Sequence, residues 1–249
     1  LRAVELGKVI DKARPVAAIC EATLLPDLEQ AMREHPGVLR HLIRFGAADD
    51  PQDLGQLAAR QPATFAACPT SADDIALLAF TSGTTGAPKA VVHTHRDVLA
   101  ACECWPRHVL RPSPDDVVTG SPPLAFTFGL GGLLIFPLWA GASIYFPDGP
   151  YKPESMVRQM REHGITTCYT APTFYRQMAP HAQAIGIPTL RTCVSAGEAL
   201  PDATRRLWHQ ATGIELLDGI GATEMFHIFI SAAGADVRHA ANGKVVPGY

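Results

Sequence analysis

Along most of the chain after residue 74, short apolar runs alternate with longer stretches in which apolar positions recur at helical spacing. Short apolar runs typical of buried strands cover residues 75–80, 90–93, 117–119, 166–170, 192–196 and 215–218. Amphipathic stretches between them predict helices, which begin at a capping box over residues 94–97 and at Pro153, Pro172 and Pro201. This alternation predicts an α/β fold with a largely parallel sheet, and it places polar motifs at strand ends, where such folds bind ligands.

The first 70 residues have a weaker pattern. Amphipathic spacing predicts helices over residues 5–13 and 25–34, around a short strand over 16–20. Residues 49–70 are rich in Ala, Gln, Pro and Asp, so we expect a surface connection with one short helix near residues 54–60.

One segment is apolar enough to raise the question of a membrane span. No charged residue occurs between Thr119 and Pro147, and the length of the segment would allow a span. Several glycines and Pro137 interrupt it, however, and no basic residues flank it. We therefore expect a buried helix over residues 130–139 that turns at Gly141 into a strand over 143–146.

Composition and charge narrow the classes of partner. Of the 249 residues, 47% are apolar and 18% are charged, which is ordinary for a folded globular protein. The formal net charge of −3 provides no basic field, so neither nucleic acid nor an anionic membrane surface is an expected partner. The six cysteines show no paired C-x-x-C spacing, and we expect reduced thiols and a cytoplasmic location.

A segment rich in hydroxyl groups and glycine follows the strand over 75–80. Its members suited to phosphate binding are Thr81, Ser82, Gly83, Thr84, Thr85, Gly86 and Lys89. The glycines let the backbone approach an anion, the hydroxyls donate hydrogen bonds, and the lysine adds positive charge. It is not the common P-loop, because Pro88 precedes the lysine and Ala90 follows it. A polar surface loop that binds nothing is the alternative from composition alone.

Residues 194–201 form a second motif, at a strand-to-helix turn. Small side chains and free backbone groups there leave room for a flat ring. A hydrolase nucleophile elbow at Ser195 is excluded, because it requires glycine two residues earlier, where Cys193 stands. A plain helix N-terminus is the remaining alternative.

A third motif, over residues 218–224, again follows a strand. It places the hydroxyl of Thr223 next to the carboxylate of Glu224. The hydroxyl can donate to a phosphate, and the carboxylate is a ligand that Mg²⁺ prefers. Alone, such a pair is weak evidence.

Together and in this order, the three motifs resemble those of the adenylate-forming superfamily, which includes acyl-CoA synthetases, peptide-synthetase adenylation domains and beetle luciferases. Two positions depart from the pattern: Ala90 replaces a usual glycine, and Ile220 replaces a tyrosine, so apolar packing takes the place of aromatic stacking on adenine. The resemblance implies stacked, largely parallel sheets flanked by helices. It implies a partial N-terminal subdomain with its connection over residues 1–70, and an ATP- and acid-binding subdomain over 71–249.

The superfamily's next motif resembles residues 243–249, where the sequence stops. The resemblance therefore covers nearly all of this chain but about half of a whole enzyme. We expect a fragment with little turnover of its own, without the mobile C-terminal domain.

The resemblance also implies roles for individual residues. Lys89, Thr223 and Glu224 would be catalytic, with Lys89 on the departing phosphates, Thr223 on the α-phosphate and Glu224 on Mg²⁺. Besides the residues of the phosphate loop, the resemblance implies nucleotide contacts for Gly197, Glu198, Ala199, Asp218, Gly219 and Ile220.

An aromatic acid is the expected substrate. The residues implied to border the acyl group are Phe126, Phe128, Tyr169, Ala196, Gly221, Met225 and His227. A short, flat, aromatic-lined pocket suits a benzene ring better than an alkyl chain. The runs over 128–131 and 220–229 resemble the benzoate-CoA and 2-aminobenzoate-CoA ligase branch in particular.

Histidines leave two questions open in the sequence. His227 could donate to the acid's carboxylate or to a ring substituent, or could be a satisfied group of the core. His93 and His95 have the spacing of a metal pair on a strand, but no third ligand is near them, so capping or packing is expected.

The activity implied by the resemblance has two half-reactions. An aromatic carboxylate, of the benzoate or 2-aminobenzoate type, reacts with Mg-ATP to give an acyl adenylate, and coenzyme A then takes the acyl group as a thioester. The alternatives are an adenylation domain that loads a carrier protein and a nucleotide-binding module without turnover. A homodimer is compatible with the sequence.

Overall fold

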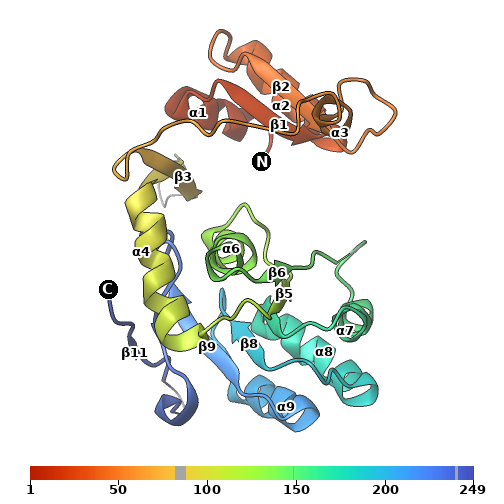
Figure 1. The fold of residues 1–249 in the computed structure, drawn as a ribbon, viewed down its shortest axis with the longest axis vertical. Helices are drawn as coiled ribbons and strands as arrows, with labels where there is room; N and C mark the ends of the chain where they lie inside the picture. Colours follow the sequence, from red (N-terminus) through yellow and green to blue (C-terminus); the bar gives the residue numbers. More distant parts are fainter. Residues whose placement is uncertain (82–87, 148, 239–240) are drawn as a thin grey trace. The chain divides into compact units, whose positions relative to one another are not determined.

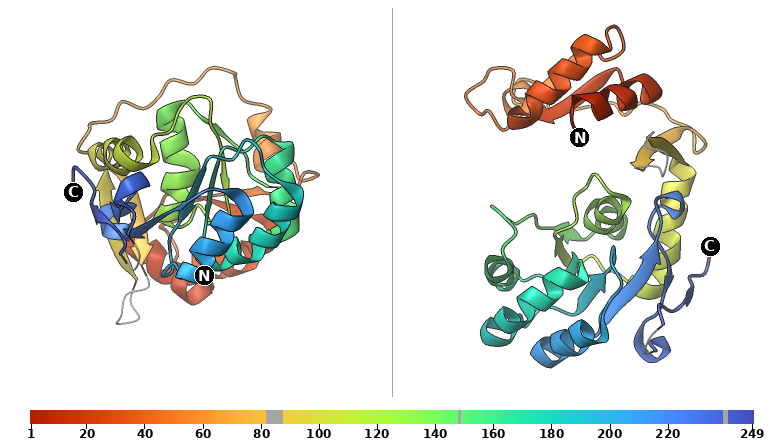
Figure 2. Two further views of the ribbon diagram at one scale, coloured as in Figure 1. Left: turned by 90° about the horizontal axis from the view of Figure 1, so that it is seen from below. Right: turned by 180° about the vertical axis from the view of Figure 1, so that it is seen from behind.

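The computed structural model describes residues 1–81, 88–147, 149–238 and 241–249 (Figures 1 and 2). The chain divides into two compact units. The first comprises Leu1–Asp74 and Leu78–Val92, and the second comprises Ile75–Leu77 and His93–Tyr249.

The first unit is built on a short parallel sheet. Its elements are α1 (Ala3–Ala13), β1 (Ala17–Glu21), α2 (Leu25–Glu34), β2 (His41–Phe45), α3 (Leu54–Ala58) and most of β3 (Ile75–Thr81) and β4 (Lys89–Thr94). β1 and β2 are parallel neighbours, with Ala17 opposite His41. Ile10 of α1 and Leu28 and Ala31 of α2 are buried in its small core, whereas residues 60–70 are almost entirely exposed.

The second unit contains a seven-stranded sheet. Its strands are β5 (Val117–Gly120), β6 (Ser143–Ile144), β7 (Thr167–Thr170), β8 (Thr192–Ser195), β9 (Leu216–Gly221), β10 (Ile228–Ser231) and β11 (Lys244–Val245). Their order in the sheet is β11-β10-β9-β8-β7-β5-β6. The five strands β5 to β9 pair with one another in parallel, whereas β10 pairs antiparallel with both β9 and β11. Every residue of β7 and β8 is buried, because helices cover both faces of the sheet. The predicted α/β fold is confirmed.

Helices of the second unit form two layers. α7 (Pro153–Glu162), α8 (Pro172–Ile185) and α9 (Asp202–Thr212) lie side by side (Figures 1 and 2) and bury Met160, Tyr175 and Trp208 against one face of the sheet. On the other face lie α4 (His95–Trp105), α5 (Thr127–Leu130) and α6 (Phe136–Ala140). The capping box that opens α4 is present, with the Thr94 hydroxyl accepting from the Asp97 amide at 3.2 Å.

The apolar segment after Gly120 is helical within this layer. α5 continues through a π-helical turn, Gly131–Ile135, into α6, and Gly141 ends the helix in the left-handed region with φ +74°. Leu133 and Phe136 are fully buried against the sheet. None of the helices described is long and apolar enough to cross a membrane.

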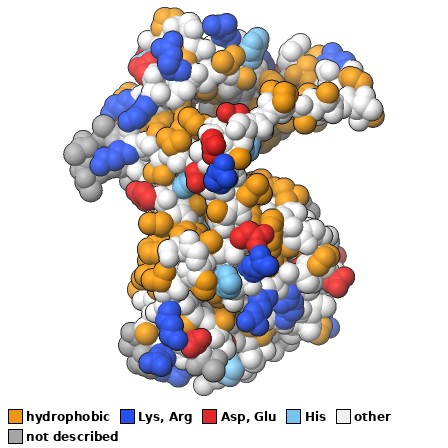
Figure 3. Space-filling view, turned by 60° about the vertical axis from the view of Figure 1, so that its left-hand side comes forward, with side chains coloured by type: hydrophobic (Ala, Val, Ile, Leu, Met, Phe, Trp, Pro, Cys, Tyr) orange, Lys and Arg blue, Asp and Glu red, His pale blue; other side chains and the backbone are white. Residues whose placement is uncertain are grey.

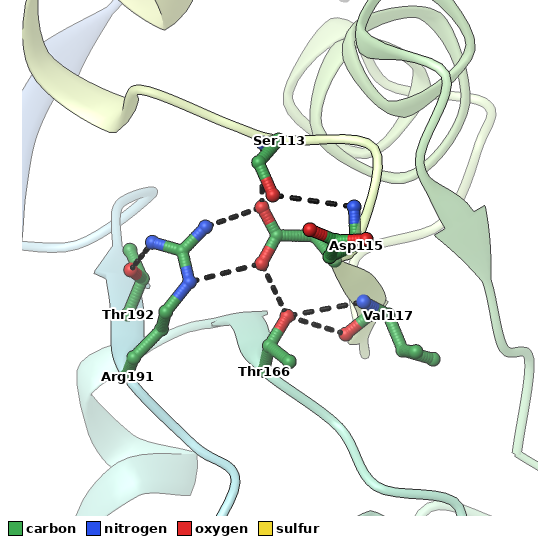
Figure 4. Close-up of polar contacts among 7 residues, drawn as sticks. Ser113, Asp115, Val117, Thr166, Arg191 and Thr192 are labelled. Carbon is green, nitrogen blue, oxygen red and sulfur yellow. Dashed lines mark hydrogen bonds and ion pairs between the residues drawn. The ribbon is translucent and has the colours of Figure 1, made fainter.

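A buried carboxylate joins the amino ends of three parallel strands. Asp116, directly before β5, accepts hydrogen bonds from the Thr166 hydroxyl at 2.6 Å and from Arg191 Nε at 3.0 Å, and Arg191 Nη2 contacts its second oxygen (Figure 4). The Ser113 amide also donates to it, at 2.7 Å. Burial alone would raise the pKa of Asp116, but these hydrogen bonds outweigh burial and lower the pKa below its usual value.

Surface charge is mixed in sign. On the face drawn in Figure 3, Lys and Arg side chains are interspersed with Asp and Glu. This distribution accords with the small formal net charge of −3.

Candidate functional site

A cavity of about 490 Å³ lies at the carboxyl ends of the parallel strands in the second unit. Successive strand ends contribute its lining: residues 121–123 and 126–128 after β5, 171 after β7, 196–198 after β8, 221–223 at the end of β9, and 227–228 at the start of β10. Strand ends of an open α/β sheet are where such folds bind small molecules. The sequence predicted three motifs at strand ends. Two of them, the motif after β8 and the motif at the end of β9, line the cavity.

His227 lies at the inner wall, within a cluster of aromatic rings. Its ring centroid is 4.7 Å from that of Phe136, 5.2 Å from Trp105 and 5.4 Å from Phe128. The side chain is only 2% exposed, and burial lowers its pKa to about 3. The imidazole is therefore neutral near pH 7.

The tautomer of His227 follows from its hydrogen bond. Nε2 lies 3.2 Å from the backbone carbonyl of Phe128. Because a carbonyl oxygen only accepts, Nε2 carries the hydrogen and Nδ1 carries the lone pair. Nδ1 is buried and has no hydrogen-bond partner within the described ranges. His227 is thus a group of the core that also lines the cavity, and its contact with a ligand stays a prediction.

The other residues predicted to border an acid lie at different depths. Phe128, Ala196 and Gly221 line the cavity, and Phe126 lines it from the rim with 64% of its surface exposed. The remaining two are not part of the lining: Tyr169 is fully buried, and Met225 is exposed.

Tyr169 is held behind the wall by its neighbours. Its ring packs edge-on against Phe128 at 5.9 Å, and a Cβ placed on Gly132 would come within 2.7 Å of it. For Tyr169 and for Met225, the role in acid binding stays a prediction.

A strained turn carries Thr223 and Glu224 between β9 and β10. Thr223–Met225 form a single 3₁₀ turn, after which Phe226 has φ +64° and ψ −43°. The His227 amide donates to the Met225 carbonyl at 2.8 Å, which closes a γ-turn of the rare positive-φ type around Phe226. A bulky residue in this conformation costs about 1–3 kcal/mol. The Phe226 ring is 2% exposed, packed edge-on against Phe136 at 6.3 Å and His93 at 5.5 Å.

His93 also contacts the same turn through a ring nitrogen. Its Nε2 lies 2.7 Å from the Thr223 carbonyl, and the side chain is buried. In the part of the chain that the structure describes, no cluster of three His, Cys, Asp or Glu residues could hold a metal. The packing predicted for His93 is confirmed.

The turn after β8 presents backbone to the cavity. Gly197, with φ +89°, lies in the left-handed region that favours glycine, and it lines the cavity together with Glu198. A Glu198 carboxylate oxygen accepts from the Thr173 hydroxyl at 2.9 Å. Ala199 lies beyond the lining.

Asp218, Gly219 and Ile220 belong to β9 and do not line the cavity. Burial raises the pKa of Asp218, whose carboxylate accepts from the Asn242 amide at 3.2 Å. Gly219 is buried, whereas Ile220 is exposed at the strand end. Their contact with a nucleotide stays a prediction.

The phosphate-loop motif lies only partly within the described residues. Thr81 ends β3, and Lys89 begins β4 with an exposed side chain. Ser82, Gly83, Thr84, Thr85 and Gly86 lie outside the described residues, so their predicted role is neither supported nor opposed by the structure.

Some residues of the lining were not singled out from the sequence. Pro122, Pro123 and Thr127 contribute to it, as do Ala171 and Ile228. Ala171 could have been found, since it directly follows a predicted strand. Nothing in the local pattern indicates the prolines, which reach the cavity through the path of the loop after β5.

Comparison with known proteins gives consistent matches over the whole chain. A family model described as AMP-binding enzyme matches residues 1–249. The chain is 39% identical to a benzoate–CoA ligase of Thauera aromatica over 96% of this chain and 45% of the relative. It is 34% identical to a 4-hydroxybenzoate–CoA/benzoate–CoA ligase of Rhodopseudomonas palustris, over 100% of this chain and 47% of the relative.

A solved structure of similar fold is that of an anthranilate CoA ligase in complex with anthranoyl-AMP. The TM-score is 0.88 at 34% identity, covering 99% of this chain and 48% of that one. The chain thus spans about half the length of the relatives it matches.

Proposed function

The chain belongs to the AMP-binding enzyme family, and from this premise we propose that its cavity binds an aromatic carboxylic acid for activation by ATP. The observation that carries the proposal is the aromatic inner wall of a cavity of about 490 Å³ at the strand ends. Phe128 offers a flat apolar face to a benzene ring, with the buried His227 ring packed against it at 5.4 Å, and a cavity of this size suits a small ligand. Similarity to benzoate–CoA ligases supports the same class of acid.

The proposed reaction of the whole protein begins with adenylate formation. A carboxylate oxygen of the acid bonds to the α-phosphorus of ATP, the bond to the bridging oxygen breaks, and pyrophosphate leaves. The Thr223 hydroxyl at the cavity wall donates to the α-phosphate, and Lys89 with the preceding loop holds the departing phosphates. Such chemistry needs positioning and charge stabilisation more than a protein base.

Glu224 is suited to hold Mg²⁺ against these phosphates. Its side chain is exposed next to Thr223, and no hydrogen bond or ion pair to another described residue engages the carboxylate. Mg²⁺ is commonly held by one or two carboxylates, phosphate oxygens and water, so a single free carboxylate fits. The bound ion would neutralise phosphate charge.

Coenzyme A is the proposed acceptor in the second half-reaction. Its thiol gives up a proton to solvent as the sulfur bonds to the acyl carbon, the carbon–oxygen bond to the phosphate breaks, and AMP leaves. The names of the relatives support coenzyme A, and loading of a carrier protein is the alternative. Thioester formation by the full-length protein, with each acceptor in turn, separates the two.

Thermal unfolding with non-hydrolysable acyl-adenylate mimics tests the proposed acid class. A ligand that binds only the folded state raises the melting temperature according to its concentration relative to its Kd. We expect benzoyl and 2-aminobenzoyl mimics to raise it, and acetyl and long-chain mimics to leave it nearly unchanged. Equal shifts for all four would refute the aromatic class while keeping adenylate binding. No shift with any of them would contradict a formed site in this chain.

A further inference from the structure

We propose that His93 is a positioning residue for nucleotide binding, because it holds the turn that carries Thr223 and Glu224 in its strained conformation. The inference rests on the proposed function, in which these two residues face the phosphates and their metal. Neither the sequence motifs nor the residues that line the cavity indicate this positioning role for His93, a buried residue of β4.

The first support is that the Thr223 carbonyl oxygen accepts two hydrogen bonds, one of them from His93. The Thr223 oxygen accepts from the Phe226 amide at 3.1 Å and from His93 Nε2 at 2.7 Å. Since a carbonyl oxygen only accepts, His93 Nε2 carries the hydrogen. The Phe226 bond is internal to the turn, whereas the His93 bond reaches it from 130 residues away. Loss of the imidazole would leave a half-buried carbonyl without its external donor.

The second support is the strain at Phe226. A residue with a bulky side chain keeps a positive φ only where its surroundings impose it. The Phe226 ring packs edge-on against the His93 ring at 5.5 Å and against the Phe136 ring at 6.3 Å. His93 therefore contacts the turn twice, at the Thr223 carbonyl and at the Phe226 ring.

The third support is the anchorage of His93 itself. It is the penultimate residue of β4, and the next residue, Thr94, caps α4 through the capping box with Asp97. Its backbone is thus fixed between a strand and a helix start. A donor on a fixed backbone orients its acceptor better than a donor on a surface loop does.

Two variants separate the donor from the ring. His93→Gln keeps an amide donor at similar reach and loses the ring, and His93→Leu keeps apolar bulk and loses the donor. His95→Gln, two residues along the chain, is the matched control. Binding of AMP and of adenosine is measured by calorimetry, since only AMP carries the phosphate that Thr223 contacts.

We expect His93→Leu to weaken AMP binding about tenfold, because the Thr223 carbonyl loses one of its two donors and the turn loses its hydrogen bond to β4, and to leave adenosine binding within about twofold. His93→Gln should recover most of the AMP affinity, and His95→Gln should match the unmodified chain. Equal loss for AMP and adenosine in His93→Leu, or no loss for either, would overturn the proposal.

Hydrogen exchange gives a readout that needs no ligand. The His227 amide closes the γ-turn, so it should exchange about tenfold faster in His93→Leu than in the unmodified chain, while core amides of β8 stay unchanged. Unchanged exchange at His227 would refute the positioning role even if nucleotide binding fell. If the unmodified chain bound no AMP, the proposed function would fail, and exchange alone would decide the role of His93.

Discussion

His227 donates its Nε2 hydrogen to the backbone carbonyl of Phe128, 99 residues earlier in the chain, across a distance of 3.2 Å. The bond joins the start of β10 to α5, so it links two walls of the cavity. It also fixes the neutral tautomer, with an acceptor at Nδ1.

Acid should destabilise the protein through His227. Its pKa is about 3 in the folded state, against 6.5 for an unperturbed histidine. Between these values the unfolded state binds a proton that the folded state does not, so the stability present above pH 6.5 is lost as the pH falls toward 3. We expect this residue to account for a decrease of about 2 kcal/mol in the free energy of unfolding between pH 7 and pH 5.

Urea unfolding at several pH values checks this expectation. The His227→Gln variant should lose less stability than the unmodified chain over the same interval, and His95→Gln should lose as much. An unchanged pH dependence in His227→Gln would show that another group titrates there.

Asp116→Asn should destabilise the sheet without changing the cavity. The carboxylate is buried and binds Thr166 and Arg191, so its loss leaves part of the Arg191 charge unpaired at the amino ends of β5, β7 and β8. We expect the free energy of unfolding to fall by about 2–3 kcal/mol, below the range for fully buried pairs because Arg191 is partly exposed. Urea unfolding measures the loss.

The matched control for Asp116 is Glu154→Gln, which removes a surface ion pair with Arg158 and should have little effect. Binding of a benzoyl-adenylate mimic to Asp116→Asn should stay within about twofold, because the cavity lies at the opposite ends of these strands. A large loss of binding would show that the amino ends control the site.

Phe128→Ala should reduce binding of aromatic ligands selectively. The Phe128 ring packs on both Tyr169 and His227, so truncation removes part of the aromatic wall. We expect affinity for a benzoyl-adenylate mimic to fall about tenfold or more and affinity for the acetyl mimic to change little. Phe126→Ala, at the exposed rim, is the control with a smaller expected loss. Equal losses for both mimics in Phe128→Ala would exclude a specific ring contact.

Glu224→Gln should remove most of the effect of Mg²⁺ on ATP binding. The amide keeps the size of the side chain but loses the charge that a divalent ion requires. Calorimetric titration with ATP, with and without Mg²⁺, should show tightening by the ion in the unmodified chain and about tenfold less tightening in the variant. The same tightening in both chains would place the metal elsewhere.

The strands from β5 to β9 could be predicted closely because parallel strands buried on both faces appear as continuous apolar runs. The run 192–196 corresponds to β8 within one residue, and 117–119 to β5. β2 was missed because its exposed ends, His41 and Phe45, blur the pattern, and β6 is two residues shorter than the predicted strand over 143–146. β11 was missed because it has only two residues, and β10 was missed although its sequence is apolar, because its first half was interpreted as part of the motif over residues 220–229.

At the site, the sequence predicted the motifs at strand ends, but it did not predict which distant residues pack against them. Ala196, Gly197, Gly221 and Thr223 line the cavity because each ends a strand or lies within two residues of a strand end. The conformation of Phe226 depends on packing partners far away in the sequence, so no local pattern indicates it.

The turn closed by the Ala222 amide and the His227 carbonyl, at 3.3 Å, has a consequence for redesign of the protein. One short loop carries both Thr223, which we propose to contact the nucleotide, and His227, which lines the cavity proposed for the acid. Under the proposed function, exchanging His227 to admit bulkier acids would therefore also disturb the contact of Thr223 with ATP. Mutational libraries that aim to broaden the acid range while sparing nucleotide affinity should vary Phe128 in α5 and Ala196 directly after β8, which lie outside this loop.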